Sequence, residues 1–352
     1  MSEYGQNCFL IDWFSASCVL DAGTDWTDML PILGLENCAP ESFTDGWGHH
    51  GYKKSRSNLG IRIYYDFTDD DNVISKCYWV EMSGRGCRTF ETLSTKTFTD
   101  LFKLCVPAAP DKEPVFARVS RIDLAFDMFD NPFIFDRVKA ARASRSIVSL
   151  FGVSTLSEGE KLTPGGAAAE YTERTIYFGS MKSDIYMRLY DKKLEQNKLD
   201  IDSWYRWEIV FKYKNALELI QTYLRDYYYK SEPVGRMFYT YLNKYISIRD
   251  YNPNDSNYRR WNVSSWWETF TSGFTTIQKL SKRKIDYNMQ HVCDLAQRVY
   301  GNTIDTILLT KGEKALIDLI KSRATQLNDA QLHLIAEFKA GERDEQERAE
   351  NA

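Results

Sequence analysis

The chain has 352 residues, enough for about two domains with buried cores. Its 43% hydrophobic and 27% charged residues are ordinary for a globular protein and exclude collagen-like, low-complexity and wholly disordered classes. Lys and Arg number 45 against 49 Asp and Glu, a net charge of −4, so any nucleic-acid site must depend on local basic residues.

The cysteines and the apolar segments indicate the cellular compartment of the protein. Seven cysteines are scattered without a CxxC pair, which argues against a disulfide framework and a zinc site. The N-terminus lacks a basic region followed by an apolar run, and no segment reaches the roughly 18 consecutive apolar residues of a membrane span. We therefore expect a cytoplasmic protein without a membrane partner.

The first 130 residues show strand patterns separated by turn residues. Alternation with period two predicts strands over Asn7–Ser17, Gly60–Phe67, Cys77–Met82 and Phe116–Asp127. The SGRG stretch of Ser83–Gly86 is typical of a turn between them. This region is therefore expected to form antiparallel hairpins.

Helices and further strands follow. Asn131 and Pro132 predict a helix start, with Pro at the first helical position. Thr163–Ala169 is expected to be a mobile connection. The remaining predicted elements are the strands Thr175–Phe178, Ile185–Asp191 and Trp204–Lys212 and the helix Asn215 to about Tyr229. The order predicts an α+β fold, a central antiparallel sheet with helices packed on one face.

The character of the chain changes beyond about residue 250, where helical periodicity replaces alternation. Leu316, Leu319 and Ile320 share one helical face. The final residues are charged and almost without apolar side chains. We therefore expect a main domain over 1–270, a small C-terminal helical module over 271–340 and a charged flexible tail over 341–352.

The most informative stretch is YMRLYDK. Alternation places Arg188, Tyr190 and Lys192 on one strand face and Met187 and Leu189 in the core. A hydroxyl nucleophile between two cations is what phosphoryl transfer to tyrosine requires. On the pattern alone, a half-buried sheet face is the commoner explanation.

Carboxylates form a second set. Asp123 and Asp127 share a strand face but lie about 13 Å apart, too far to chelate one ion by themselves. Glu208 on another strand could complete a site for Mg²⁺ or Mn²⁺, which prefer oxygen ligands. The alternative, and on pattern alone the commoner one, is a set of arginine–carboxylate pairs across strands.

Basic side chains gather in three places and could follow a phosphate backbone, although most such runs are solvated surface. The candidate DNA-binding residues are Lys53, Lys54, Arg56, Arg85, Arg88, Lys282, Arg283 and Lys284. His49 and His50 are expected in a surface loop, where one of them could move a proton.

Taken in order, five segments resemble the replication initiation factor family of rolling-circle plasmid and phage initiators and related conjugative relaxases. They are IDWFS at Ile11–Ser15, VEMSGRGCRTFE at Val80–Glu91, RIDLAFD at Arg121–Asp127, TIYFGSMKSDIYMRLYDKKLEQ at Thr175–Gln196 and WYRWEIVFK at Trp204–Lys212.

The resemblance implies a function and site residues. Family members nick one origin strand through a tyrosine that becomes linked to the 5′-phosphate, and they use a divalent metal and commonly work as dimers. Tyr190 then is the nucleophile, Arg188 and Lys192 are catalytic cations, and the acidic positions are Asp123, Asp127 and Glu208. The sequence therefore predicts a metal-dependent strand transferase that binds origin DNA, with a homodimeric state and a host helicase as further partners. The alternatives are a conjugative relaxase with the same chemistry and a non-catalytic origin-binding protein.

Overall fold

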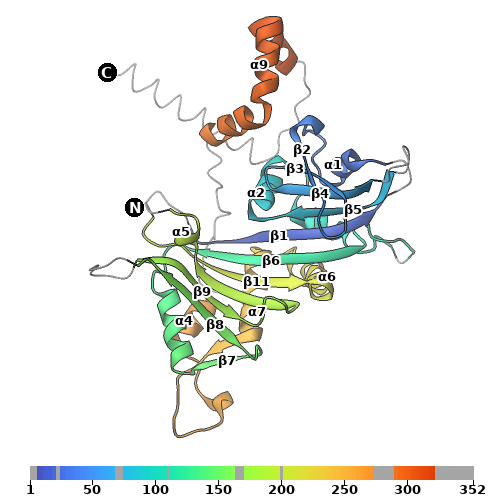
Figure 1. Ribbon diagram of the computed structural model, residues 1–352. Coiled ribbons are helices and arrows are strands. Elements are labelled where there is room, and N and C mark those ends of the chain that lie inside the picture. The colour runs from blue at the N-terminus through green and yellow to red at the C-terminus, as the bar shows by residue number, and fades with distance from the viewer. Residues whose placement is uncertain are drawn as a thin grey trace, which may run out of the picture.

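A large antiparallel sheet organises the chain (Figure 1). The structure is a computed structural model that describes residues 6–20, 24–67, 74–109, 111–162, 170–198, 201–272 and 289–321. The strands are β1 (Cys8–Val19), β2 (Thr44–Trp47), β3 (Lys54–Asn58), β4 (Ile61–Phe67), β5 (Ile74–Met82), β6 (Arg118–Met128), β7 (Ile147–Ser149), β8 (Ser154–Glu160), β9 (Tyr171–Phe178), β10 (Ile185–Asp191), β11 (Tyr205–Lys212) and β12 (Ile246–Ile248).

The strand order is nearly symmetric about the centre. Ten strands pair in the order β2-β3-β4-β5-β1-β6-β11-β10-β9-β8, while β7 and β12 form a separate pair. The central strands β1 and β6 therefore each begin one half of the sheet. From β6 outward, β11 and β10 follow, so the three strands that carry the predicted site are neighbours.

The helices are α1 (Met29–Ile32), α2 (Gly84–Leu93), α3 (Phe98–Leu104), α4 (Ile134–Ala143), α5 (Lys192–Glu195), α6 (Tyr213–Thr222), α7 (Pro233–Tyr245), α8 (Ser265–Ser272) and α9 (Met289–Lys321). Most of them cover one face of the sheet, whereas α9 lies apart from it (Figure 1). Short 3₁₀ turns occupy Trp26–Asp28, Pro40–Ser42 and Tyr258–Arg260, and a π-helical segment, Tyr223–Tyr227, follows α6. No helix in these described ranges is long and apolar enough to cross a bilayer.

Alternation along the strands decides which side chains enter the core. On β6, Ile122, Leu124 and Phe126 join one hydrophobic cluster with residues of the helices. Phe126 lies 5.9 Å from Phe238 of α7, ring centre to ring centre, and Trp207 of β11 lies 5.7 Å from Trp267 of α8. The opposite face of these strands is left for polar side chains. This arrangement confirms the expected α+β fold.

Two local predictions are wrong. The SGRG stretch is not a turn between strands, because α2 begins at Gly84. The helix expected at Pro132 begins two residues later, at Ile134. Residues 131–134 form a turn instead, in which the Ile134 amide donates to the Asn131 carbonyl oxygen.

Other predictions fall where the structure gives no description. Thr163–Ala169, the basic run Lys282, Arg283 and Lys284, and the tail over 341–352 lie outside the described residues. Of the expected C-terminal module, the structure describes α9, which is interrupted at Gly312.

Candidate active site

Three neighbouring strands bring the predicted residues together on the polar face of the sheet. Arg188 of β10 lies opposite Glu208 of β11 in the strand register. Arg206 of β11 lies opposite Asp127 of β6, two positions from Glu208. The sheet therefore joins residues from segments that are far apart in the sequence.

Tyr190 contacts Glu208 directly. Its hydroxyl donates a hydrogen bond of 2.5 Å to Oε1 of Glu208. The tyrosine is 5% exposed, and the glutamate is fully buried. Burial, followed by the charge of Glu208, raises the pKa of the Tyr190 phenol far above its ordinary value. The phenol therefore keeps its proton unless a base takes it, and Glu208 is in contact with that proton.

Both predicted cations lie at the same tyrosine. The Arg188 guanidinium donates to Oε2 of Glu208 at 2.6 Å and lies 4.9 Å from the Tyr190 ring centre. The Lys192 ammonium lies 5.4 Å from that ring, although Lys192 begins α5 rather than continuing the strand, and it pairs with Glu195. The phenol thus stands between two positive charges.

Arg206 is the centre of a group to which the sequence assigned no role. Its guanidinium binds Asp127 through two hydrogen bonds of 2.6 and 2.7 Å. The same group contacts Asp12 of β1 at 2.7 Å and lies 3.9 Å from Glu208. Trp204 also donates its indole hydrogen to Asp127, at 2.9 Å. Three buried or nearly buried carboxylates therefore surround one buried guanidinium.

Asp12 was missed as a site residue, although it lies within the IDWFS segment. The register between β1 and β6 shifts between Ile11 and Trp13, which makes Asp12 the extra residue of a β-bulge. Burial raises the pKa of Asp12 above its ordinary value, against the opposing charge of Arg206. The ID pair shared with RIDLAFD was the signal that could have indicated it.

Asp123 has an arginine of its own. Arg121 donates two hydrogen bonds to it, of 2.8 and 2.6 Å, and lies over the Trp13 ring at 4.4 Å. Burial is the main reason that the pKa of Asp123 rises to about 6. Asp123 therefore binds a different arginine from the carboxylates around Arg206.

This geometry tests the expected metal ligands. Asp123, Asp127 and Glu208 are each bound by an arginine, and Glu208 also accepts from Tyr190. Among the described residues, no three Asp, Glu, His or Cys side chains are grouped to hold an ion. The three carboxylates, as arranged, fit guanidinium groups rather than a divalent ion, so no chemical step below passes through a metal.

Among the described residues, the predicted DNA-binding side chains of the β2–β3 hairpin lie apart from this group, whereas Arg88 of α2 lies close enough for its charge to act on Asp12. Lys53 and Lys54 are exposed near the tip of the β2–β3 hairpin, and Arg85 is exposed on α2. Arg56 pairs with Asp45 at 3.1 Å, and Arg88 donates to the Ile11 carbonyl oxygen. The sequence reasoning missed Trp47 in the same hairpin, whose side chain is 94% exposed.

Comparison with known proteins agrees with the fold. The family described as replication initiation factor matches residues 117–320. The putative DNA relaxase NicK of Bacillus subtilis (strain 168) is 26% identical over 249 residues, which cover 68% of this chain and 65% of the relative's own length. The rolling-circle replication initiator protein of Geobacillus stearothermophilus superposes with a TM-score of 0.64 at 24% identity, over 79% of this chain and all of that one, a likeness of fold alone.

The family match spans more than half of the chain and includes β6, β10 and β11. The chain therefore belongs to the replication initiation factor family, which confirms the resemblance.

Proposed function

We propose that the protein nicks one strand of origin DNA through Tyr190 and later rejoins it, as a rolling-circle replication initiator. The observation that carries this proposal is the 2.5 Å hydrogen bond from the Tyr190 hydroxyl to Glu208, placed between Arg188 and Lys192. A nucleophile in contact with a base, beside fixed positive charge, is the arrangement that phosphoryl transfer needs.

Glu208 acts as the general base. It takes the phenolic proton as the Tyr190 oxygen bonds to phosphorus, and the bond between phosphorus and the 3′-oxygen breaks. The products are a 5′-phosphotyrosyl linkage and a 3′-oxygen that solvent protonates to a free hydroxyl primer. Because the linkage conserves the energy of the phosphodiester, attack by a 3′-hydroxyl reverses the reaction and rejoins the strand.

The neighbouring cations stabilise charge during this step. Arg188 lies 4.9 Å from the tyrosine ring and offsets the negative charge that develops on the phosphoryl oxygens. Lys192, at the start of α5, does the same at 5.4 Å from the tyrosine ring. Arg206 holds Asp127 and Asp12, and it lies 3.9 Å from the base, so its role is to position Glu208.

The proposal includes the substrate, the cofactor, the partners and the location that the sequence predicts. Origin DNA with a hairpin or single-stranded nick site is the expected substrate, Mg²⁺ or Mn²⁺ the expected cofactor, and a homodimer, a host helicase and the cytoplasm the expected setting. A divalent ion at this site would have to compete with the guanidinium groups of Arg121, Arg188 and Arg206.

A conjugative relaxase is the second candidate, favoured by the name of the Bacillus subtilis relative. Both candidates use the same covalent step, so they differ in the DNA site that is nicked. Incubation with plasmid-origin and transfer-origin oligonucleotides separates them, because only the cognate oligonucleotide gives a covalent adduct.

The nucleophile is tested by Tyr190→Phe, which removes only the attacking oxygen. We expect the SDS-resistant adduct with a labelled single-stranded oligonucleotide to disappear while DNA binding persists. Tyr186→Phe is the matched control, since Tyr186 shares the strand, the face and nearly the same burial, 6% against 5% exposed. An adduct that survives in Tyr190→Phe and is lost in Tyr186→Phe would show that the wrong tyrosine was chosen.

A further inference from the structure

The polar face of the sheet carries a second arrangement that matches the candidate active site. The N-terminal half runs outward as β1, β5, β4, β3 and β2, and the C-terminal half as β6, β11, β10, β9 and β8 (Figure 1). In this comparison β5 is the equivalent of β11, and β4 is the equivalent of β10.

The equivalent strands pair the same residue types in the same register. Arg62 of β4 lies opposite Glu81 of β5, as Arg188 lies opposite Glu208. Two residues after the arginine, each half has a tyrosine, which in the N-terminal half is Tyr64. The Arg–Glu–Tyr set of the active site is therefore present twice.

The contacts of the two tyrosines differ, because among the described residues the Tyr64 hydroxyl does not donate to a carboxylate as the Tyr190 hydroxyl does. Nη1 of Arg62 donates to the Tyr64 hydroxyl oxygen at 3.0 Å and lies 3.6 Å from Glu81. The phenol oxygen thus accepts from the arginine, whereas in the active site Tyr190 donates its proton to Glu208.

The positions that hold the buried charges have also changed. Trp79 lies opposite Tyr64, where the active site has Arg206 opposite Tyr190. Ser17 lies opposite Trp79, in the place that Asp127 occupies. A guanidinium and a carboxylate are thus replaced by an indole and a hydroxyl.

These changes produce an aromatic cluster beside an exposed cation. The Trp79 ring lies 4.9 Å from Tyr64, 4.4 Å from His50 and 6.4 Å from Tyr52, which it stacks against. Trp79 is 7% exposed and Tyr64 2% exposed, so the rings of this cluster that reach solvent are those of His50 and Tyr52. Arg62 keeps 48% of its side chain exposed. Aromatic faces with a neighbouring arginine are the features that bind single-stranded nucleic acid.

We propose that His50, Tyr52 and Arg62 form a second, non-covalent binding site for single-stranded DNA, an inference that rests on the proposed nicking function. The bases stack on the rings of His50 and Tyr52, which the buried Trp79 and Tyr64 support from below, and Arg62 contacts a phosphate. Five strand spacings separate β4 from β10, or about 24 Å, which a strand of several nucleotides spans. The second site thus holds the same strand at a distance from the nicked phosphate.

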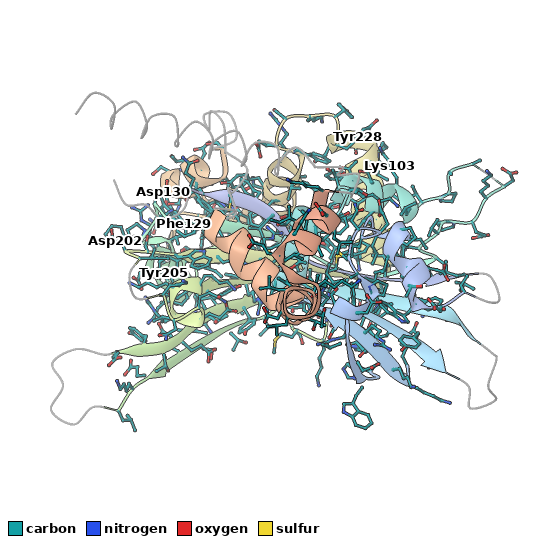
Figure 2. The ribbon with its side chains drawn as sticks, turned by 90° about the horizontal axis from the view of Figure 1, so that it is seen from above. Lys103, Phe129, Asp130, Asp202, Tyr205 and Tyr228 are labelled. Carbon is teal, nitrogen blue, oxygen red and sulfur yellow. The ribbon has the colours of Figure 1, made fainter. Side chains whose placement is uncertain are left out.

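Length-dependent binding tests this proposal without any cleavage. In a Tyr190→Phe background, the affinity for labelled oligothymidylates of about 4 and about 12 nucleotides is measured by fluorescence anisotropy. Arg62→Gln and Tyr52→Leu should each reduce the affinity advantage of the longer oligonucleotide about fivefold or more, since a phosphate contact or a stacking contact is lost and stacking contributes about 1–3 kcal/mol per base. Lys103→Gln is the control, an exposed cation on α3, which packs on the opposite face (Figure 2).

Three outcomes decide the matter. A reduced length advantage in both variants, with 5-iodouracil cross-links at His50 or Tyr52, supports the site. An unchanged length advantage overturns it, as does a covalent adduct on Tyr64, which would make this set catalytic. Because the assay measures binding alone, a failure of nicking in the native protein would leave this test intact.

Discussion

At the residue scale, each buried carboxylate of the candidate active site is bound by an arginine side chain, which limits the other roles that the carboxylate can have. Arg206 is almost fully buried and contacts carboxylates of β1 and β6. Burying such a charge is costly unless it is paired and hydrogen-bonded. Asp127 accepts two hydrogen bonds from that guanidinium, so its first role is to compensate the charge of the buried arginine.

We therefore expect Asp127→Asn to destabilise the protein strongly. Loss of the carboxylate leaves part of the Arg206 charge uncompensated, at a cost of about 3–5 kcal/mol. Asp45→Asn breaks an exposed pair with Arg56 and should cost less than about 1 kcal/mol. Urea unfolding followed by circular dichroism measures both values. Equal costs for the two variants would contradict this role of Asp127.

Asp123 should make stability depend on pH. Its folded pKa of about 6 lies above the ordinary 3.8, so between these values the folded state binds more protons than the unfolded state. The free energy of unfolding should then fall by about 2 kcal/mol as the pH rises from 4 to 6, out of about 3 kcal/mol over the whole titration. Arg121 opposes this shift, and Glu208 and Asp12 add to it.

The check is the difference in unfolding free energy between the native protein and Asp123→Asn at pH 4, 5, 6 and 7. Because the amide does not titrate there, the native protein should lose stability relative to the variant over this range. A difference that stays constant with pH would show that Asp123 is ionised throughout.

Sequence alternation could predict the faces of single strands but not their pairing. It placed Arg188 and Tyr190 together on one face of their strand, and Asp123 and Asp127 together on one face of theirs. The pairing of Arg188 with Glu208 depends on the register of two strands, which a single sequence does not encode locally. Asp12 was not predicted as a site residue for a related reason, because a one-residue bulge changes the alternation at that point.

At the scale of elements, tertiary contacts override local signals. Gly84–Gly86 resembles a turn, yet α2 begins there. A Cβ atom at Gly86 would lie 2.1 Å from the Gly60 carbonyl oxygen, so the helix approaches the β3–β4 turn closely. The glycine is required by this packing rather than by a turn. A sequence read segment by segment cannot show such a contact between residues 26 positions apart.

The β2–β3 hairpin is the element from which we expect salt-dependent DNA binding. Lys53 and Lys54 are exposed there. If both contact phosphates, replacing them with Ala should make the log–log salt slope on duplex DNA shallower by about two units. Arg56→Ala should instead lower stability, since Arg56 pairs with Asp45 and lies 5.3 Å from the Trp26 ring.

Anisotropy titrations at several salt concentrations measure this slope. The control is a double replacement of Lys103 and Lys214 with Ala, two exposed lysines on helices of the opposite face. If the hairpin and control variants give the same slope, the hairpin lies outside the DNA interface.

For the whole molecule, one core joins both halves of the sheet. A single hydrophobic cluster includes Ile63 and Val80 from the N-terminal half and Leu189 and Trp207 from the C-terminal half. The sequence predicted most of the long strands and the α+β class. It could not predict the strand order, because β1 pairs with β6 across more than a hundred residues.

This core predicts where the chain can be shortened. In the described ranges, its last members are Trp267, which is fully enclosed, and the partly buried Phe270. Figure 1 shows α9 apart from the sheet. We therefore propose that the main domain ends near Ser272, close to the boundary expected from the sequence, and that residues 1–272 fold without the C-terminal module.

A chain ending at Ser272 should unfold in one cooperative transition, with a melting temperature within about 3 °C of that of the full chain. A chain ending at Arg260 is the matched comparison, because it also loses α8 and the packing of Trp267 on Trp207. Loss of such a buried aromatic residue costs about 3–5 kcal/mol, which should lower the melting temperature far more. Thermal unfolding by circular dichroism compares the three chains. If the chain ending at Ser272 melts as low as the shorter one, the C-terminal module is part of the folding unit and the boundary is wrong.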